Sequence, residues 1–148
     1  MAAVRQANAV WNGGLADGSG SVSAATSGKF TDLDVTWPSR SEEHHGGRTS
    51  PEELLAASHA SCYAMALSHV LGSGGNTPES LEVSASVTFD QVGEGFGVVS
   101  SALTVRGKVP GIDADAFNEA AETAKDGCPI SGAMKGNVAL SVEATLDN

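Results

Sequence analysis

The two cysteines, Cys62 and Cys128, are the residues of this 148-residue chain best suited to covalent chemistry. A thiol reacts as its thiolate, which forms at neutral pH only where a cation or a helix N-terminus stabilises it. Cys128 precedes Pro129, and proline is favoured at the first position of a helix. Cys128 is therefore expected at an N-cap, where the pKa of a thiol is lowered. Such a thiol is suited to attack on an oxidised partner sulfur.

Cys62 is expected in a different environment, in the middle of a long helix. Burial there raises the pKa of a thiol, and the dipole of its own helix does not offset this. A reactive Cys62 needs a cation, and Arg40 and Arg48, shortly before the helix, are the candidates. Glu52, in the first helical turn, is placed to anchor an arginine. Glu52 and Cys62 lie about 15 Å apart along one helix, so we expect that arginine to reach a thiolate on a different helix, in this chain or in a partner.

Each of these residues also has a purely structural interpretation. A single buried cysteine in a helix is more often a small hydrophobic residue than a nucleophile. Two arginines beside His44 and His45 are typical of a solvated loop. A metal site built from the cysteines and histidines stays open, but no Cys-x-x-Cys or His-x-x-x-His spacing supports it. His59 and His69 are ten residues apart, which is not the i, i+4 spacing of a metal pair.

A helix over residues 50–71 is expected to position Cys62. Ser50 and Glu53 form the Ser-x-x-Glu pattern of a capping box, and Gly72 follows as the expected left-handed stop. Apolar or small side chains lie on nearly every face of this helix. That pattern predicts a helix enclosed by protein, with Cys62 deep inside.

Alternating apolar and polar residues predict strands on both sides of this helix. The segments are 4–12, 21–25 and 33–37 before it, and 81–90, 96–108 and 138–146 after it. The strands at 81–90 and 96–108 flank a glycine-rich turn and should form an antiparallel hairpin.

The other segments complete the expected order. Residues 39–48 are polar and predict a mobile loop, with Gly46 and Gly47 as its hinge. Asp113 should cap a second helix over 114–126, and Cys128 opens a short third helix. The resulting order, βββ-α-ββ-αα-β, predicts an α+β fold with mostly antiparallel pairing. At this length a single domain over residues 1–148 is expected.

The composition and charge of the chain limit the classes of partner that it can bind and the compartment expected for it. A net charge of −10 argues against nucleic acid or an anionic membrane as a partner. No apolar run is expected to reach the ~18 residues of a membrane span, and the N-terminus lacks a hydrophobic signal core. A cytoplasmic location follows as the expectation. That compartment keeps thiols reduced, so the cysteines should be either buried thiols or a redox pair.

Two stretches resemble one known family. Residues 49–68 are similar to the central helix of the OsmC/Ohr family of thiol-dependent hydroperoxide reductases, in the sequence Thr-Ser-Pro-Glu-Glu-Leu-Leu-Ala-Ala-Ser-His-Ala-Ser-Cys-Tyr-Ala-Met-Ala-Leu-Ser. Residues 127–131, Gly-Cys-Pro-Ile-Ser, resemble that family's second-cysteine motif. Val109-Pro-Gly-Ile-Asp113 and the element order agree, so the resemblance covers nearly the whole chain. The histidine before Ala-Ser-Cys and the Met-Ala-Leu after it look more like the OsmC branch than the Ohr branch.

The resemblance implies an OsmC-like fold in an intertwined homodimer, with long central helices between two sheets and active sites at the subunit interface. It implies that Cys62 is the peroxidatic cysteine and Cys128 the resolving one. Glu52 matches the family glutamate, and Arg40 matches the family arginine better than Arg48. The implied cycle needs no metal or prosthetic group. A hydroperoxide oxidises Cys62 to a sulfenic acid, Cys128 condenses with it into a disulfide, and a small-molecule or protein dithiol restores both thiols.

Two other classes of function compete with a peroxidase. A redox sensor would use the same cysteine pair but needs a partner-binding surface, and the sequence shows no DNA-reading helix or basic patch. A ligand-binding or structural stress protein would not need both cysteines. Repeated rather than stoichiometric consumption of peroxide, with a dithiol supplied, separates the three.

Overall fold

The computed structural model describes residues 1–148 as two compact units, Met1–Glu53 and Leu54–Asn148. One helix, α2 (Pro51–Ser73), begins in the first unit and continues into the second. All of the strands expected from the sequence are present, which confirms the α+β class. The single domain over residues 1–148 stays a prediction.

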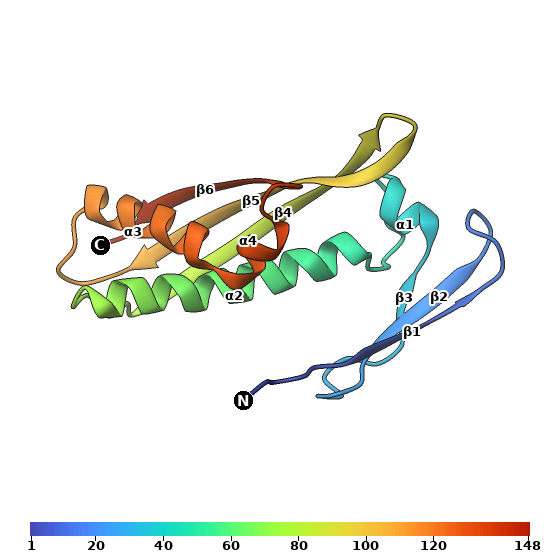
Figure 1. Cartoon of the computed structure of the whole chain (residues 1–148), viewed down its shortest axis with the longest axis horizontal. Coiled ribbons are helices and arrows are strands. Elements are labelled where there is room, and N and C mark those ends of the chain that lie inside the picture. Colours follow the sequence, from blue (N-terminus) through green and yellow to red (C-terminus); the bar gives the residue numbers. More distant parts are fainter. The chain divides into compact units, whose positions relative to one another are not determined.

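The first unit contains a small antiparallel sheet in the order β1-β2-β3 (Figure 1). Its strands are β1 (Ala7–Asn12), β2 (Ser19–Ala24) and β3 (Leu33–Val35). A short helix, α1 (Trp37–Ser41), follows where a strand end and a loop were expected. Thr36 and Ser39 form its capping box, each hydroxyl bonding the other's backbone N–H at 3.1 and 3.0 Å. This local hydrogen bonding ends the strand two residues early.

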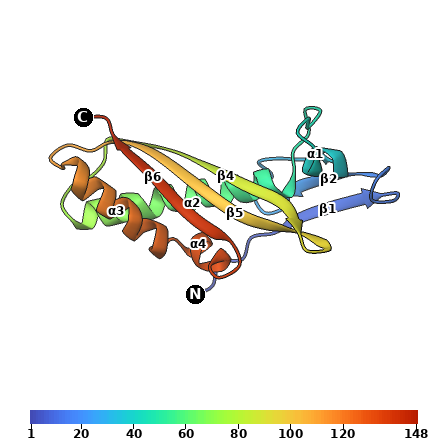
Figure 2. The same cartoon turned by 90° about the horizontal axis from the view of Figure 1, so that it is seen from above.

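The second unit holds a sheet in the order β4-β5-β6. The hairpin of β4 (Ser80–Val92) and β5 (Gly95–Lys108) is antiparallel, as predicted. The last strand, β6 (Ala139–Leu146), pairs with β5 in parallel. Between them the chain forms α3 (Ala114–Gly127) and α4 (Pro129–Met134). Figures 1 and 2 show α2 and α3 running along one face of this sheet.

The core of the second unit lies between that face and the helices. Helix α2 contributes Tyr63, Leu67 and Leu71, spaced four residues apart, and all are at most 2% exposed. Helix α3 packs closely on β5 because Gly107 has no side chain: a Cβ there would lie 2.6 Å from Cζ of Phe117. The start of α3 is therefore held against the sheet by a close contact between helix and strand.

Helix α2 differs from its prediction at both ends. The Ser50 hydroxyl accepts from the Glu53 N–H at 3.1 Å, but the Glu53 carboxylate accepts from Thr49 Oγ1 at 2.6 Å, so only half of the capping box forms. The helix runs through Gly72 to Ser73. After the helix, the first glycine in the left-handed region is Gly75, at φ +86°. The short loop before β4 needs that conformation, whereas Gly72 continues the helix.

The enclosed helix expected from the sequence is wrong for the single chain. The outward face of α2 is open to solvent, and Met65 on it is 72% exposed. Small residues on this face give the same pattern as a buried helix, because they are not polar enough to indicate a face exposed to solvent. By length and composition α2 is also apolar enough to cross a membrane, contrary to expectation, although the core helix of a soluble protein passes the same test.

Candidate thiol active site

The structure brings Cys62 and Cys128 together in the second unit, although 66 residues separate them in the chain. Cys62 lies in the middle of α2 and is half-buried rather than deep inside. Cys128 is the N-cap of α4, as predicted, and is 1% exposed. Both are free thiols, and their side chains interact with each other. The helix positions predicted for the two cysteines are confirmed; their catalytic roles stay predictions.

The two thiols differ in acidity. Burial raises the pKa of Cys62, and its neighbour Cys128 raises it further, while the backbone N–H of Ile130 offsets only part of this. This is the direction expected of a mid-helix thiol without a cation. No cation is among the groups that shift the pKa of Cys62, so a reactive thiolate at neutral pH would need a positive charge close to it.

Cys128 is shifted in the opposite direction. Burial alone would raise its pKa, but groups that favour the thiolate outweigh it: the backbone N–H and the hydroxyl of Ser131, the Cys62 thiol and the backbone N–H of Ile130. The net effect is a pKa below the ordinary value of a cysteine. Cys128 Sγ makes no regular capping hydrogen bond, so this effect comes from several surrounding donors rather than one cap.

A buried polar cluster lies next to this thiol pair, and sequence reasoning missed it. His59 is fully buried on α2, one turn before Cys62. Its Nδ1 lies 2.7 Å from Ser101 Oγ on β5, and its Nε2 lies 2.8 Å from Ser131 Oγ on α4. Burial lowers the pKa of His59, so the ring is neutral at neutral pH. The available signal in the sequence is the position of His59, three residues before Cys62 on the same helix. The spacing of His59 and His69 indicates only that they do not form a metal pair.

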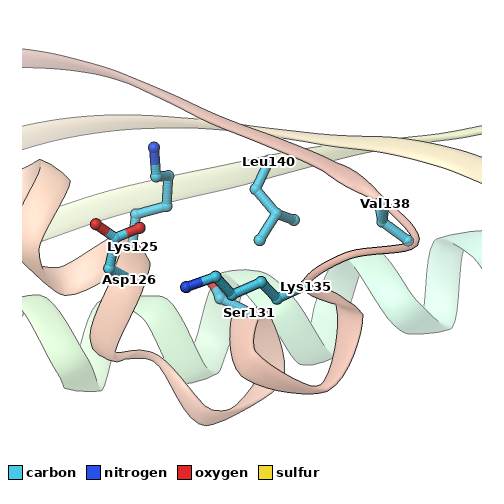
Figure 3. Close-up of a pocket in the computed structure, with 6 residues that line it drawn as sticks. All are labelled: Lys125, Asp126, Ser131, Lys135, Val138 and Leu140. Atoms are coloured by element: carbon cyan, nitrogen blue, oxygen red, sulfur yellow. The ribbon is translucent and has the colours of Figure 1, made fainter.

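A pocket of about 190 Å³ opens beside Ser131 (Figure 3). Figure 3 shows the Lys135 side chain extending close to Ser131, with Lys125 and Asp126 on the neighbouring end of α3. Lys125 Nζ pairs with Glu122 at 2.7 Å, which raises the pKa of the lysine. The hollow between the end of α3, α4 and the start of β6 is therefore polar and partly cationic.

The first unit contains the predicted arginine–glutamate pair. Arg40, on α1, binds the Glu52 carboxylate through Nε and a terminal nitrogen, each 3.0 Å from Oε1. Glu52 is 6% exposed, and its other oxygen, Oε2, is buried without a hydrogen-bond partner. Arg48 is exposed and reaches only the Gly46 carbonyl, at 3.5 Å. Of the two candidate arginines, Arg40 is the one that Glu52 holds.

Arg40 also borders an apolar pocket of about 300 Å³ within the first unit. Two tryptophans and several aliphatic side chains form most of its wall, and the lining residues are Trp11, Leu15, Val35, Thr36, Trp37, Arg40 and Pro51. Such a pocket can accept an alkyl or aryl group close to a fixed positive charge. No group of three or more His, Cys, Asp or Glu side chains is arranged to hold a metal ion.

Comparison with known proteins agrees with this arrangement. The family model described as OsmC-like protein matches residues 44–143. The chain is 39% identical over 139 residues to the peroxiredoxin OsmC of Escherichia coli (strain K12), a match that covers 94% of this chain and 95% of the relative. It is 30% identical over 120 residues to the organic hydroperoxide resistance protein of Xanthomonas axonopodis pv. citri (strain 306), covering 80% and 82%.

Solved structures show the same fold. The organic hydroperoxide resistance protein OhrB of Bacillus subtilis aligns with a TM-score of 0.72 and 27% identity, over 95% of this chain and 98% of that one. The organic hydroperoxide resistance protein of Elizabethkingia anophelis, crystallised with thiocyanate bound, aligns with a TM-score of 0.77 and 25% identity, over 99% and 100%. With the family model and the full-length similarity to peroxiredoxin OsmC, these matches show that the chain belongs to the OsmC/Ohr family, in its OsmC branch.

Proposed function

We propose that this protein is a thiol peroxidase that reduces organic hydroperoxides, and also hydrogen peroxide, through a Cys62 sulfenic acid and a Cys62–Cys128 disulfide. The observation that carries the proposal is the contact between two free cysteines from distant parts of the chain, with Cys128 held at the start of α4. The names of the relatives, a peroxiredoxin and an organic hydroperoxide resistance protein, support a peroxidase.

The proposed cycle balances in three steps. The Cys62 thiolate attacks the distal peroxide oxygen, so that a sulfur–oxygen bond forms, the O–O bond breaks, and the leaving alkoxide takes a proton to become an alcohol. The Cys128 thiolate then attacks Cys62 Sγ, forming the disulfide and releasing hydroxide, which is protonated to water. An external dithiol reduces the disulfide to two thiols by two exchange reactions and is itself oxidised to a disulfide.

Arg40 is the proposed source of the charge that Cys62 needs. A guanidinium beside a thiolate favours the charged form and lowers the pKa of the thiol. The ion pair with the buried Glu52 supports this role, because two contacts to one carboxylate oxygen hold the Arg40 guanidinium in one position. We propose that this charge acts on a Cys62 thiolate of the same chain or of a partner chain.

The proposed substrate preference follows from the pocket beside Arg40. Its walls are largely apolar, and it is large enough for the organic part of a small hydroperoxide. Hydrogen peroxide lacks such a group and gains nothing from the pocket. Organic hydroperoxides should therefore have the higher kcat/KM.

The proposed mechanism can be tested by mass spectrometry after one equivalent of an organic hydroperoxide. The wild-type chain should lose two hydrogen atoms and show a Cys62–Cys128 linked peptide, which a dithiol reverses. Cys128→Ser should consume about one equivalent and then stall, with sulfinic acid forming at Cys62 as peroxide is added. Sustained turnover by Cys128→Ser at the wild-type rate would contradict the resolving role of Cys128.

We also propose a cytoplasmic homodimer. The open face of α2 supports it, because a large exposed side chain such as Met65 on a row of small residues is typical of a surface covered by another chain. Light scattering at micromolar concentration should give a dimer, and Met65→Asp should shift it toward monomer. A wild-type monomer under these conditions would contradict both the dimer and a site shared between subunits.

A further inference from the structure

His59, Ser101 and Ser131 form a buried, hydrogen-bonded cluster between α2, β5 and α4. Burying a polar side chain costs free energy unless it is hydrogen-bonded, and three elements here each contribute one polar residue to satisfy the others. Apolar side chains could fill the same space between α2, β5 and α4 without leaving any buried polar group that needs a hydrogen bond. The arrangement therefore needs a reason, and the position of Ser131 supplies one.

Ser131 connects the cluster to Cys128. It lies in the first turn of α4, three residues after Cys128, and is 1% exposed. Its hydroxyl is 2.8 Å from His59 Nε2 and also favours the thiolate of Cys128. A serine hydroxyl has a single proton but can accept through its lone pairs. If that proton points at the sulfur, the bond between Ser131 and His59 must be donated by the histidine.

The direction of every bond in the cluster then follows. A neutral imidazole donates from one nitrogen and accepts at the other. With Nε2–H donating to Ser131, Nδ1 accepts from the Ser101 hydroxyl, at 2.7 Å. Three successive donors, from Ser101 through His59 to Ser131, point toward Cys128 Sγ. Hydrogen bonds in such a row polarise one another in the same direction.

We propose that Ser131 holds the attacking thiolate of Cys128 and that His59, as its Nε2–H tautomer, is the positioning residue that turns the Ser131 hydroxyl toward the sulfur. The proposal rests on the resolving role of Cys128 proposed above. His59 gives up no proton during the reaction. It fixes the orientation of the hydroxyl, so that the hydroxyl favours the Cys128 thiolate over the thiol when Cys62 becomes a sulfenic acid.

The lowered pKa of Cys128 agrees with this arrangement. Other titratable groups also lie around the network and must be identical in the two variants that each test compares. They are Cys62 and Tyr63 on α2, Lys125 and Asp126 at the end of α3, and Lys135 after α4.

The tautomer of His59 can be measured in the wild-type chain, with a variant needed only to assign the signals. The ¹⁵N chemical shifts of the His59 ring, assigned by comparison with His59→Gln, should show a protonated Nε2 and an unprotonated Nδ1 at about pH 8, above the ordinary histidine pKa of about 6.5. A protonated Nδ1 with an unprotonated Nε2 would overturn the proposal, because the Ser131 proton would then be used on the histidine.

The second measurement is the pH dependence of the Cys128 thiolate, followed by its ultraviolet absorbance in a Cys62→Ser background, because Cys128 is 1% exposed and reacts poorly with external reagents. Adding Ser131→Ala should raise the pKa read from this curve and lower the fraction of thiolate at neutral pH about tenfold, the effect of losing one hydrogen bond to a charged group. Leu71→Val, a core change elsewhere on α2, serves as the control for reduced stability and should leave the curve in place. An unmoved curve in Ser131→Ala would overturn the proposal.

The third measurement follows disulfide formation in chains with both cysteines after a single addition of peroxide. Ser131→Ala should slow the disulfide step about tenfold and leave the preceding oxidation of Cys62 unchanged. Equal slowing of both steps would contradict a role specific to Cys128. Failure of the peroxidase function itself would appear as no Cys62 oxidation in the wild type, whereas the titration of the Cys128 thiolate and the His59 tautomer would still decide the role of the network.

Discussion

Cys62→Ser is expected to lower peroxide turnover by roughly a thousandfold or more, to the background of the reductant alone. The serine hydroxyl is not ionised at neutral pH and cannot form a sulfenic acid or a disulfide, so both oxidative steps are lost together. The remaining thiol, Cys128, is 1% exposed and has little access to peroxide. Steady-state consumption of an organic hydroperoxide with excess dithiol measures the effect.

Ser61→Ala is the matched control for this change. Ser61 is the exposed neighbour of Cys62 on α2, and its hydroxyl only reaches the Ser58 carbonyl, at 3.1 Å. Turnover in Ser61→Ala should stay close to wild type. Wild-type activity in Cys62→Ser would exclude Cys62 as the peroxidatic residue and point to Cys128 acting alone.

Removal of the Arg40 charge is expected to produce the second-largest effect. The pKa of Cys62 is already raised by burial, and a nearby guanidinium typically lowers the pKa of a thiol by about one to three units. Without it, fewer Cys62 side chains are thiolates at pH 7, and the peroxide step should slow by roughly ten- to a hundredfold. Because the thiolate is the reactive form, raising the pH should restore the rate. Stopped-flow rates and alkylation curves from about pH 5 to 10, spanning the ordinary cysteine value, measure the shift.

The buried partner of Arg40 determines which variant is informative. Arg40→Ala alone leaves the Glu52 carboxylate unpaired at 6% exposure, and breaking a buried ion pair in this way is strongly destabilising. Arg40→Met with Glu52→Gln removes both charges and separates loss of activation from loss of fold. Glu52→Gln alone should have a milder effect, since Arg40 keeps its charge but loses its anchor.

Arg48→Ala is the control for charge in the same segment. Arg48 is exposed and contacts only a backbone carbonyl, so its removal should leave the alkylation curve of Cys62 in place. A shift in Arg48→Ala with none in the Arg40 variants would reverse the assignment. Unmoved curves in all of them would show that some other group stabilises the thiolate.

Most of the fold could be predicted because its signals are local. The alternation in β4 and β5, the Asp113 cap of α3 and the Cys128–Pro129 start of α4 each depend on a few neighbouring residues, and all are present. Helix α1 differs from the expected strand over 33–37 and loop over 39–48, because Pro38 stands in the first turn of a helix that Thr36 caps. The parallel pairing of β6 with β5 depends on the path of two intervening helices, which no local pattern records.

The site was predictable where one side chain needs another of opposite charge. An arginine that is to act on a thiolate needs an anchoring carboxylate, and Glu52 in the first helical turn is placed to pair with Arg40. The His59 cluster was not predictable in the same way, because Ser101 and Ser131 are uncharged and lie 42 and 72 residues from the histidine. Only the packing of α2, β5 and α4 shows that these three side chains share one buried space.

The separation of the two cysteines along the chain would link the stability of the fold to the chemistry of the proposed disulfide. Strands β4 and β5 and helix α3 all lie between Cys62 and Cys128, so an oxidised chain closes a loop of 66 residues around them. In the chain-entropy description, a loop of this length stabilises the folded state by about 4 kcal/mol relative to the unfolded chain. A thermodynamic cycle requires that folding stabilise the disulfide by the same amount. The oxidised protein is then the more heat-resistant of the two redox forms, and each reduction by a dithiol returns the chain to its less stable state.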